Sequence, residues 1–193
     1  MTMNKAIFLD RDGTLNVEKN YLYKIEDFEW LPGAIDALKL LQDAGYLLVI
    51  VTNQSGIGRG YYTEEDYLKL ENWMTRTLKE QGINLSAVYH CPHLPDAQVE
   101  EYRKDCTCRK PKLGMFRQAI ADLDIDEDRS YAIGDKIRDC AICAKTRCKG
   151  FLIAENERPE IIQQVKSGEY KGVRYAKDLL ESAKMIVGHL NTL

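Results

Sequence analysis

The sequence predicts an α/β protein, a Rossmann-like three-layer α/β/α sandwich whose central sheet is mainly parallel. Three observations support this prediction. Short apolar runs of strand length alternate along the chain with segments of helical periodicity, as in folds built from β–α units. Several of these runs end in acidic or amide side chains, as strands do where parallel sheets bind ligands. No linker or internal repeat divides the 193 residues, so one domain is expected over residues 1–193.

The first predicted strand covers residues 6–9 and is followed by two aspartates, Asp10 and Asp12. If the strand continues, alternation turns both carboxylates to the same side, and like charges that close need a cation or a shared proton. Gly13 then permits a tight turn away from the strand. Taken alone, this stretch also fits a solvated turn, so its interpretation depends on the rest of the chain.

The elements that follow have ordinary start and stop signals. Ile35 and Leu38 lie at helical spacing, and Gly45 ends that helix. Thr63 and Asp66 form a variant of the capping box at the start of the next helix. In order, we predict a helix over residues 34–44, a strand over 46–51, a helix from 63 to about 81, a strand over 85–90, a helix over 114–123, a strand over 130–135, a helix ending at 144, a strand over 150–153 and two weaker α/β segments, with no regular pattern over 16–32 and 91–112.

Polar side chains also follow two later strands, at the point where each strand ends. Residues 52–55 read Thr-Asn-Gln-Ser, and Asp135 ends the fourth strand. Because parallel strands end at one edge of a sheet, these groups should lie close to Asp10. A loop with Arg109 and Lys110 is placed to reach the same edge. Carboxylates bind Mg²⁺, and lysine, hydroxyl and backbone N–H groups neutralise phosphate oxygens, so we predict a site for a divalent cation and a phosphoryl group.

The composition argues against several classes of protein. Hydrophobic residues make up 45% of the chain and charged residues 30%, as in ordinary globular proteins. The net charge of −3 argues against a general partner of nucleic acids or of anionic membranes. The first residues lack the apolar core of a signal peptide, and no apolar run is long enough to span a bilayer. We therefore expect a cytoplasmic protein. We also expect a monomer that acts on a small molecule, although the sequence itself does not indicate the oligomeric state.

Six cysteines in such a chain favour metal ligands or buried thiols over disulfides. Cys91, Cys106 and Cys108, together with His93, supply three sulfurs and one imidazole, a set that suits tetrahedral Zn²⁺. All four coordination positions would then be filled, so the zinc would be structural. Buried free thiols are the alternative. His90 is a second candidate for the imidazole, although its position in a strand favours a core or surface role.

The other three cysteines, Cys140, Cys143 and Cys148, need a separate explanation. Cys140 and Cys143 lie three residues apart on the inward side of a predicted helix, where cysteine acts as a small apolar residue. We expect core packing, with a second metal or redox site as the alternative. The predicted zinc-binding loop is therefore confined to residues 91–108.

Four spaced motifs resemble those of the haloacid dehalogenase-like phosphatases. Their occurrence together and in order is far more specific than any one of them. The resemblance extends over residues 6–153. The motifs are D-x-D-G-T from Asp10 to Thr14, a threonine at a strand end (Thr52), a lysine (Lys110), and G-D-x-x-x-D, which contains Asp135 and Asp139.

The resemblance implies a mechanism through an aspartyl phosphate that depends on Mg²⁺. Asp10 would attack phosphorus, and Asp12 would protonate the departing sugar oxygen and then deprotonate the attacking water. Mg²⁺ would bind Asp10, the backbone carbonyl of Asp12, and Asp135. Thr52 and Lys110 would hold the oxygens of the transferred group. The other implied residues are Asp139, which would orient Lys110, and the substrate contacts Glu18, Lys19, Asn20, Tyr21, Asn53, Gln54, Ser55, Arg109 and Lys136.

Within that class the chain is similar to the branch that contains heptose-bisphosphate and histidinol-phosphate phosphatases. Residues 52–60, 91–93 and 106–111 carry this similarity. The long cysteine-rich loop between His93 and Cys106 resembles that of the D-glycero-D-manno-heptose 1,7-bisphosphate 7-phosphatases. Histidinol-phosphate phosphatases usually have a shorter loop there.

This similarity implies hydrolysis of the C7 phosphate to give heptose 1-phosphate, in the synthesis of nucleotide-activated heptose for lipopolysaccharide core, S-layer or capsule. No large cap insertion is visible in the sequence, so we expect a minimal cap and an open crevice bounded by short loops. Two alternatives remain open at this point. One is histidinol-phosphate phosphatase of histidine biosynthesis, and the other, from a different class, is a zinc-dependent nucleic-acid-binding module. The sequence does not indicate the preferred anomer.

Overall fold

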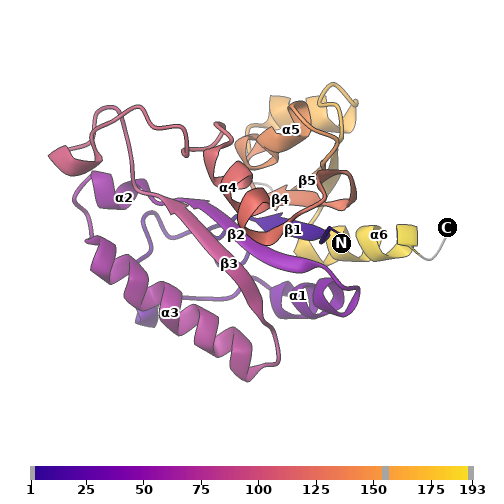
Figure 1. Ribbon diagram of the computed structural model, residues 1–193, viewed down its shortest axis with the longest axis horizontal. Helices are drawn as coiled ribbons and strands as arrows, with labels where there is room; N and C mark the ends of the chain where they lie inside the picture. The colour runs from indigo at the N-terminus through magenta and orange to yellow at the C-terminus, as the bar shows by residue number, and fades with distance from the viewer. Residues whose placement is uncertain (1–2, 154–156, 191–193) are drawn as a thin grey trace.

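The sheet of this protein, seen in a computed structural model, contains parallel strands throughout the described parts of the chain. The structure describes residues 3–153 and 157–190. Within them six strands lie in the order β3-β2-β1-β4-β5-β6 (Figure 1), and each neighbouring pair is parallel. The predicted α/β fold with a parallel sheet between helices is confirmed. The strands are β1 (Ala6–Leu9), β2 (Leu47–Asn53), β3 (Leu85–Cys91), β4 (Tyr131–Gly134), β5 (Lys149–Ile153) and β6 (Val173–Ala176).

Helices cover both faces of the sheet (Figure 1). One core contains residues of α1, α3 and α6, and the core on the other face contains residues of α4, η4 and α5. No helix in residues 3–153 or 157–190 is long and apolar enough to cross a membrane. The helices are α1 (Ala34–Asp43), α2 (Ser55–Gly58), α3 (Glu64–Glu80), α4 (Gly114–Leu123), α5 (Pro159–Lys166) and α6 (Leu179–Leu190), with 3₁₀ segments η1 (Ile25–Asp27), η2 (Glu100–Tyr102), η3 (Glu127–Arg129) and η4 (Ile137–Ala144).

Strand β1 lies at the centre of the sheet because its side chains are apolar on both faces. Ile7 and Leu9 belong to the core with α1 and α6, whereas Ala6 and Phe8 belong to the opposite core. Phe8 meets Phe116 of α4 edge to face, with ring centroids 5.3 Å apart. Full burial of a side chain of this size stabilises the fold by about 1.5–3 kcal/mol. The carboxyl end of β1 is thereby held in one place.

Segment η4 packs closely on β5 and contains the second group of cysteines. Its backbone is 3₁₀ rather than α-helical, and Cys140 departs from helical geometry with φ −95° and ψ 15°. Cys140, Cys143 and Cys148 are all buried in the core. A Cβ atom at Gly150 of β5 would lie 2.9 Å from the Sγ atom of Cys143 and 3.0 Å from that of Cys140. The absence of a side chain at this glycine therefore permits the close contact between η4 and β5.

Strands β1, β2 and β4 end at the same edge of the sheet. β1 lies between β2 and β4, so the strand order reverses direction at β1. In open parallel sheets the crevice for a ligand forms outside the carboxyl ends of the strands at such a reversal. A functional site is therefore expected among the residues that follow β1, β2 and β4.

Candidate active site

Three buried acids gather at this edge. Asp10 follows β1, Asp135 follows β4, and Asp139 lies in η4; each offers a carboxylate oxygen within 4.8 Å of the others. Gly13 has φ +78°, and a Cβ atom there would lie 2.5 Å from the Oδ2 atom of Asp135. At Gly134 a Cβ atom would lie 2.3 Å from the Cβ atom of Asp139. The two glycines therefore permit the close spacing of the acids.

Lys110 reaches the acids from the loop that precedes α4. Its Nζ atom lies 2.9 Å from Asp10 Oδ1, 2.7 Å from Asp139 Oδ1 and 2.6 Å from the carbonyl oxygen of Val51. Burial alone would lower the pKa of Lys110, but the carboxylates of Asp10 and Asp139 raise it, so the ammonium stays charged. The amide of Asn53 accepts from the backbone N–H of Lys110 at 3.0 Å and donates to its carbonyl at 3.1 Å. The end of β2 thus holds the lysine loop in place.

Lys110→Ala should leave Asp10 and Asp139 without their shared cation, so the free energy of unfolding of the metal-free protein should fall by about 3–5 kcal/mol. Urea unfolding measures this change. Lys69→Ala, which removes an exposed lysine of α3, is the control and should leave the free energy of unfolding unchanged. Wild-type stability in Lys110→Ala would contradict the role of Lys110 as the shared cation.

The site contains more negative charge than its own buried cations neutralise. Four carboxylates face two buried cations, which leaves an excess of two negative charges. A divalent cation would offset this excess, and carboxylate oxygens are the ligands that Mg²⁺ prefers. The donor set therefore fits Mg²⁺. The acids are Asp10, Asp12, Asp135 and Asp139, and the cations are Arg11 and Lys110.

Burial raises the pKa values of two of these acids. The pKa of Asp10 rises to about 6, although Lys110 lowers it, and the pKa of Asp135 rises to about 7 because Asp10 and Asp139 add like charge to the burial. A carboxyl group whose pKa is higher in the folded than in the unfolded chain stabilises the folded state most at low pH. This stabilisation of the metal-free protein is complete below about pH 4 and is lost as the pH rises through 6 and 7.

Stabilisation by Mg²⁺ should therefore increase with pH, because the metal binds the deprotonated ligands. Millimolar Mg²⁺ should raise the thermal midpoint by several degrees at pH 8 and have little effect at pH 5. Differential scanning fluorimetry at both pH values measures this difference. In Asp135→Asn the shift should disappear at both pH values, and equal shifts in the wild-type protein at pH 5 and pH 8 would contradict the expectation.

The carboxylate of Asp12 is held by three neighbouring side chains. Arg11 donates to both of its oxygens at 2.9–3.1 Å, Asn16 donates to Oδ1 at 3.0 Å, and Gln54 donates to Oδ2 at 2.9 Å. Arg11 is only 1% exposed and also donates to the carbonyl of Leu22 at 3.0 Å. Arg11 and Asn16 are not among the residues that the sequence predicts for the site. The available signal was the position of Arg11 between two acids, because a guanidinium that is buried needs a carboxylate partner.

Gln54 and its neighbours Thr52 and Ser55 come from the end of β2 and the start of α2. Thr52 is buried, and its Oγ1 atom accepts from Gln54 Nε2 at 3.0 Å. The Oε1 atom of Gln54 accepts from the hydroxyl of Tyr62 at 2.7 Å. Both ends of the Gln54 amide are thus engaged within the protein, whereas Ser55 is half-buried at the first position of α2.

The predicted substrate contacts of the first loop lie on an exposed segment. Glu18, Lys19, Asn20 and Tyr21 are all exposed. Asn20 and Tyr21 have φ values of +51° and +67°, and such left-handed conformations cost about 1–2 kcal/mol per residue. The ring of Tyr21 packs edge to face on that of Tyr61, with centroids 4.7 Å apart. Strained backbone of this kind is typical of functional loops.

Three arginines form a positively charged group beside the acids. Burial lowers the pKa of Arg109, and the charges of Arg138 and Arg59 lower it further. Arg109 Nη1 and Arg59 Nε are buried without a hydrogen-bond partner in the described parts of the chain. An anion would offset this repulsion and accept from these donors. Lys136, also predicted, has its Nζ atom 3.8 Å from Asp135 Oδ2. Arg59 and Arg138 are not among the site residues predicted from the sequence, although Arg138 lies within the G-D-x-x-x-D motif.

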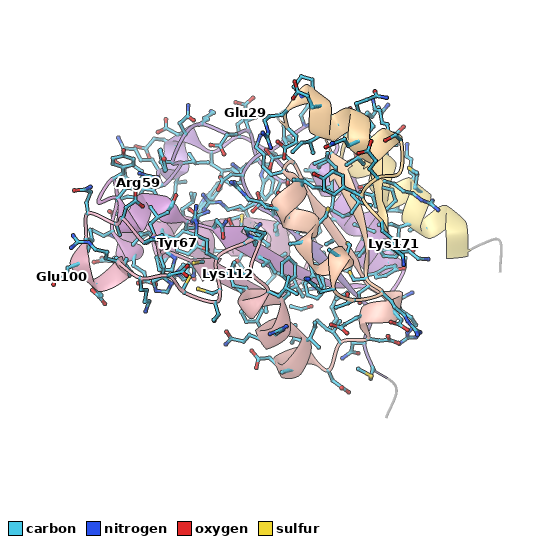
Figure 2. The ribbon with its side chains drawn as sticks, turned by 90° about the horizontal axis from the view of Figure 1, so that it is seen from above. Glu29, Arg59, Tyr67, Glu100, Lys112 and Lys171 are labelled. Carbon is cyan, nitrogen blue, oxygen red and sulfur yellow. The ribbon has the colours of Figure 1, made fainter. Side chains whose placement is uncertain are left out.

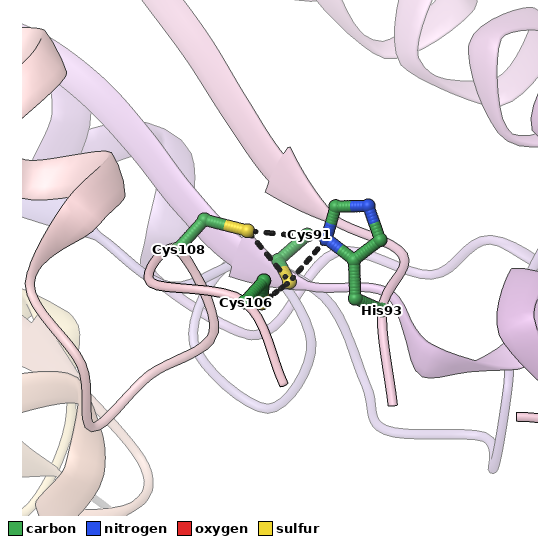
Figure 3. A group of neighbouring side chains, drawn as sticks. All are labelled: Cys91, His93, Cys106 and Cys108. Atoms are coloured by element: carbon green, nitrogen blue, oxygen red, sulfur yellow. Dashed lines mark hydrogen bonds between the residues drawn. The ribbon is translucent and has the colours of Figure 1, made fainter. Parts of the chain in front are cut away.

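Cys91, His93, Cys106 and Cys108 form a second cluster, shown in Figure 3. The Sγ atom of Cys91 lies 3.5 Å from that of Cys106 and 3.2 Å from that of Cys108. The Nδ1 atom of His93 lies 3.6 Å from Cys91 Sγ and 3.3 Å from Cys108 Sγ. These separations are close to the edge of about 3.7 Å expected for a tetrahedron of sulfurs about 2.3 Å from zinc. The donor set therefore fits Zn²⁺.

The loop that contains this cluster is attached to α3 and α2. Glu64, the first residue of α3, lies 2.8 Å from His90 Nε2 and accepts from the hydroxyl of Tyr102 at 2.9 Å. His90 is thus engaged outside the cluster. The N–H of Val99 donates to the carbonyl of Gly58 in α2 at 3.0 Å. Figure 2 shows Glu100 of η2 and Arg59, which follows α2, at the same end of the molecule. No sequence signal beyond its place at a helix start marked Glu64.

An aspartate after the first strand, a buried lysine and two further acids on this fold define a phosphatase of the haloacid dehalogenase-like class. A family model described as polynucleotide kinase 3 phosphatase matches residues 5–155. The D-glycero-beta-D-manno-heptose-1,7-bisphosphate 7-phosphatase of Haemophilus influenzae is 47% identical over 157 residues, which are 81% of this chain and 85% of that protein. The chain belongs to the family that the model describes and, within it, to the D-glycero-D-manno-heptose-1,7-bisphosphate 7-phosphatases.

Other relatives agree with this assignment. The enzyme of the same name from Haemophilus ducreyi is 55% identical over 136 residues, covering 70% of this chain and 74% of that protein. A D-glycero-alpha-D-manno-heptose-1,7-bisphosphate 7-phosphatase from Photorhabdus laumondii is 50% identical over 135 residues, covering 70% and 74%. The crystal structure of D,D-heptose 1,7-bisphosphate phosphatase from B. bronchiseptica, complexed with magnesium and phosphate, matches with a TM-score of 0.80 at 30% identity and covers 96% of this chain and 99% of that chain.

Proposed function

We propose that the protein removes the C7 phosphate of D-glycero-D-manno-heptose 1,7-bisphosphate, giving heptose 1-phosphate in the synthesis of nucleotide-activated heptose. One observation carries this proposal: relatives of that named activity are 44–55% identical to a chain whose Asp10, Lys110 and Asp135 lie together in one buried site. This combination favours heptose bisphosphate over histidinol phosphate, and an enzyme over a nucleic-acid-binding module.

Asp10 is the nucleophile in this proposal. Lys110, 2.9 Å from its Oδ1 atom, fixes the carboxylate. A bond forms between the carboxylate and phosphorus as the bond from phosphorus to the C7 oxygen breaks, and Asp12 gives a proton to the departing oxygen. In the second step Asp12 takes a proton from a water molecule that attacks phosphorus. The bond to Asp10 then breaks, and inorganic phosphate leaves.

Mg²⁺ fits the acid cluster, and the solved relative from B. bronchiseptica is described as complexed with magnesium and phosphate. Asp10, the backbone carbonyl of Asp12, and Asp135 would hold the ion. When bound, it neutralises negative charge on the phosphoryl oxygens and on the acids themselves. The two positive charges of the ion would offset the two negative charges that Arg11 and Lys110 leave unneutralised in the site.

Thr52 and Lys110 hold the oxygens of the transferred group. Phosphoryl transfer needs charge stabilisation at these oxygens more than covalent assistance. The buried hydroxyl of Thr52 and the ammonium of Lys110 supply it. Asp139, 2.7 Å from the Nζ atom of Lys110, keeps the ammonium directed at Asp10.

Zn²⁺ fits the cluster of Cys91, His93, Cys106 and Cys108. When bound, it ties together a loop that is otherwise short of regular structure. The same loop leads directly into Arg109 and Lys110. The zinc therefore has a structural role, because it positions two residues of the site.

The second phosphate of the substrate binds at the group of arginines. Arg109 presents an unpartnered buried N–H there, with Arg59 and Arg138 adding positive charge. Lys136 contributes from the loop after β4. The sugar lies between this group and the nucleophile. The contacts expected along the sugar are Glu18, Lys19, Asn20, Tyr21, Asn53 and Ser55. Gln54, also predicted as a contact, is buried with both ends of its amide engaged, so in this proposal it holds Asp12 and Thr52.

Phosphate release from a panel of substrates tests this function. The panel contains the α and β anomers of heptose 1,7-bisphosphate, histidinol phosphate, an oligonucleotide with a 3′-phosphate, and simple sugar phosphates, each with and without Mg²⁺. One heptose bisphosphate anomer should have a kcat/KM at least about 100-fold above the substrates without heptose, because buried cations reject a substrate that leaves them unpaired. Both anomers are needed because relatives carry both names. Preference for histidinol phosphate or the oligonucleotide would overturn the proposal.

Activity as a monomer and a cytoplasmic location complete the proposal. None of the six cysteines, all of which lie in the described parts of the chain, forms a disulfide, and reduced cysteines persist in a reducing compartment. Light scattering at assay concentrations would measure the oligomeric state. A dimer that loses activity on dilution would contradict activity as a monomer.

A further inference from the structure

We propose that Tyr62 is a positioning residue for this reaction, which acts through Gln54 to hold the carboxylate of Asp12 in place for proton transfer. The inference rests on the role of Asp12 as acid and base in the proposed function. It adds a residue that lies outside every motif of the sequence and that does not itself reach the reacting atoms.

A chain of hydrogen bonds connects the three residues. The hydroxyl of Tyr62 donates to Gln54 Oε1 at 2.7 Å, and Arg11 Nη2 lies 3.4 Å from the same oxygen. Two donors on Oε1 leave the amide one orientation, with Nε2 turned toward the site. That nitrogen donates to Asp12 Oδ2 at 2.9 Å and to Thr52 Oγ1 at 3.0 Å. If the amide turned over, its oxygen would face the carboxylate and repel it.

The contact from Gln54 differs from the other contacts to Asp12. Among the hydrogen bonds that the described residues make to the Asp12 carboxylate, those from Arg11 and Asn16 come from the same turn after β1. The bond from Gln54 comes from the end of β2. It therefore fixes Asp12 relative to Thr52, which holds the transferred phosphoryl group in the proposed function. Without this bond, Asp12 would be held only by Arg11 and Asn16, which lie in its own turn.

The ring of Tyr62 occupies a tightly defined place. It is 6% exposed and stacks on Tyr23, with centroids 5.2 Å apart and planes inclined by 15°. A Cβ atom at Gly56 would lie 2.1 Å from Tyr62 Cε1 and 2.8 Å from its hydroxyl oxygen, so glycine at this position leaves the room that the ring needs. Burial raises the pKa of Tyr62 well above its usual value of 10, so its hydroxyl remains a donor at the pH values where the enzyme works.

The first test compares two leaving groups. Heptose bisphosphate releases a sugar oxygen that needs a proton, whereas p-nitrophenyl phosphate releases a phenolate that leaves without one. Tyr62→Phe keeps the ring and removes the hydroxyl. It should lower kcat for heptose bisphosphate by about three- to tenfold with KM unchanged, the effect of one lost hydrogen bond, and change turnover of p-nitrophenyl phosphate less than about twofold. Tyr46→Phe, which removes another buried phenol at the opposite edge of the sheet, should change neither.

The second test asks whether Tyr62 acts through Gln54. Gln54→Ala should lower kcat for heptose bisphosphate at least as much as Tyr62→Phe does, because it removes the donors to both Asp12 and Thr52. Adding Tyr62→Phe to it should lower this kcat by less than about twofold more, because residues that act in series are not additive. In Tyr62→Phe, equal losses on both substrates or no loss would overturn the inference, as would additive losses in the double variant. Asp12→Asn distinguishes a failure of the inference about Tyr62 from a failure of the proposed function. If Asp12→Asn is inactive on heptose bisphosphate while Tyr62→Phe is unaffected, only the inference fails; if Asp12→Asn is fully active, the proposed acid and base role fails with it.

Discussion

Asp10→Asn should abolish phosphate release, lowering kcat by at least about 10⁴-fold, because an amide cannot attack phosphorus as a carboxylate does. The substitution preserves the size of the side chain, and Lys110 keeps its ion pair with Asp139 at 2.7 Å, so the variant should stay folded. Steady-state phosphate release measures the loss. Acid quenching during turnover should recover a phosphorylated protein from the wild type and none from Asp10→Asn.

The matched control is Asp36→Asn, which changes an exposed acid on α1 in the same way. It should retain wild-type kcat and KM. Circular dichroism and thermal unfolding verify that both variants are folded. Phosphoprotein recovered from Asp10→Asn, or turnover near the wild-type rate, would show that another group accepts the phosphoryl group.

Loss of zinc should have the second large effect, because it would release the loop that contains Lys110. Structural zinc sites have apparent binding energies of about 10–16 kcal/mol, comparable to the whole stability of a domain. His93→Gln should therefore lose the metal and expose residues 91–108 to proteolysis. Its kcat should fall by about 10² or more, since Lys110 is no longer held against Asp10.

His90→Gln is the control for this prediction, because it removes the other nearby imidazole. His90 contacts Glu64 rather than the sulfurs, so this variant should keep about one zinc per chain and resist the protease. Mass spectrometry of bound metal and limited proteolysis measure both outcomes. A His93→Gln protein with full zinc content would contradict the assignment of the ligands.

The fold was predictable because the central strands are apolar on both faces. An alternation such as that of Ile7 and Phe8, buried in different cores, leaves no other place for the strand than the middle of a sheet. Acids cannot continue such a strand, so Asp10 and Asp135 mark the edge where strands end. The same physical argument brings Lys110 to this edge, since a loop with cations is stabilised beside clustered carboxylates.

The groups that hold the site in place were not predictable from the same patterns. Tyr62, Glu64 and Arg11 act through hydrogen bonds whose partners come from other segments of the chain, and periodicity says nothing about the direction of a side-chain donor. The pairing of Gln54 with Asp12 needs the register of β2 against β1 as well as the rotamer of each side chain. Such contacts become visible only when the strands are placed in space.

Gly13 and Gly134 restrict substitution at the centre of the site, whereas the exposed segment over residues 18–21 tolerates it. A side chain at either glycine would collide with an acid of the site, so a saturation library at these two positions should contain glycine alone among its active clones. The exposed segment over residues 18–21 carries no such restriction on side-chain volume. In the proposed function this segment contacts the sugar, so we expect substitutions in it to change which sugar is accepted while the phosphoryl chemistry is retained.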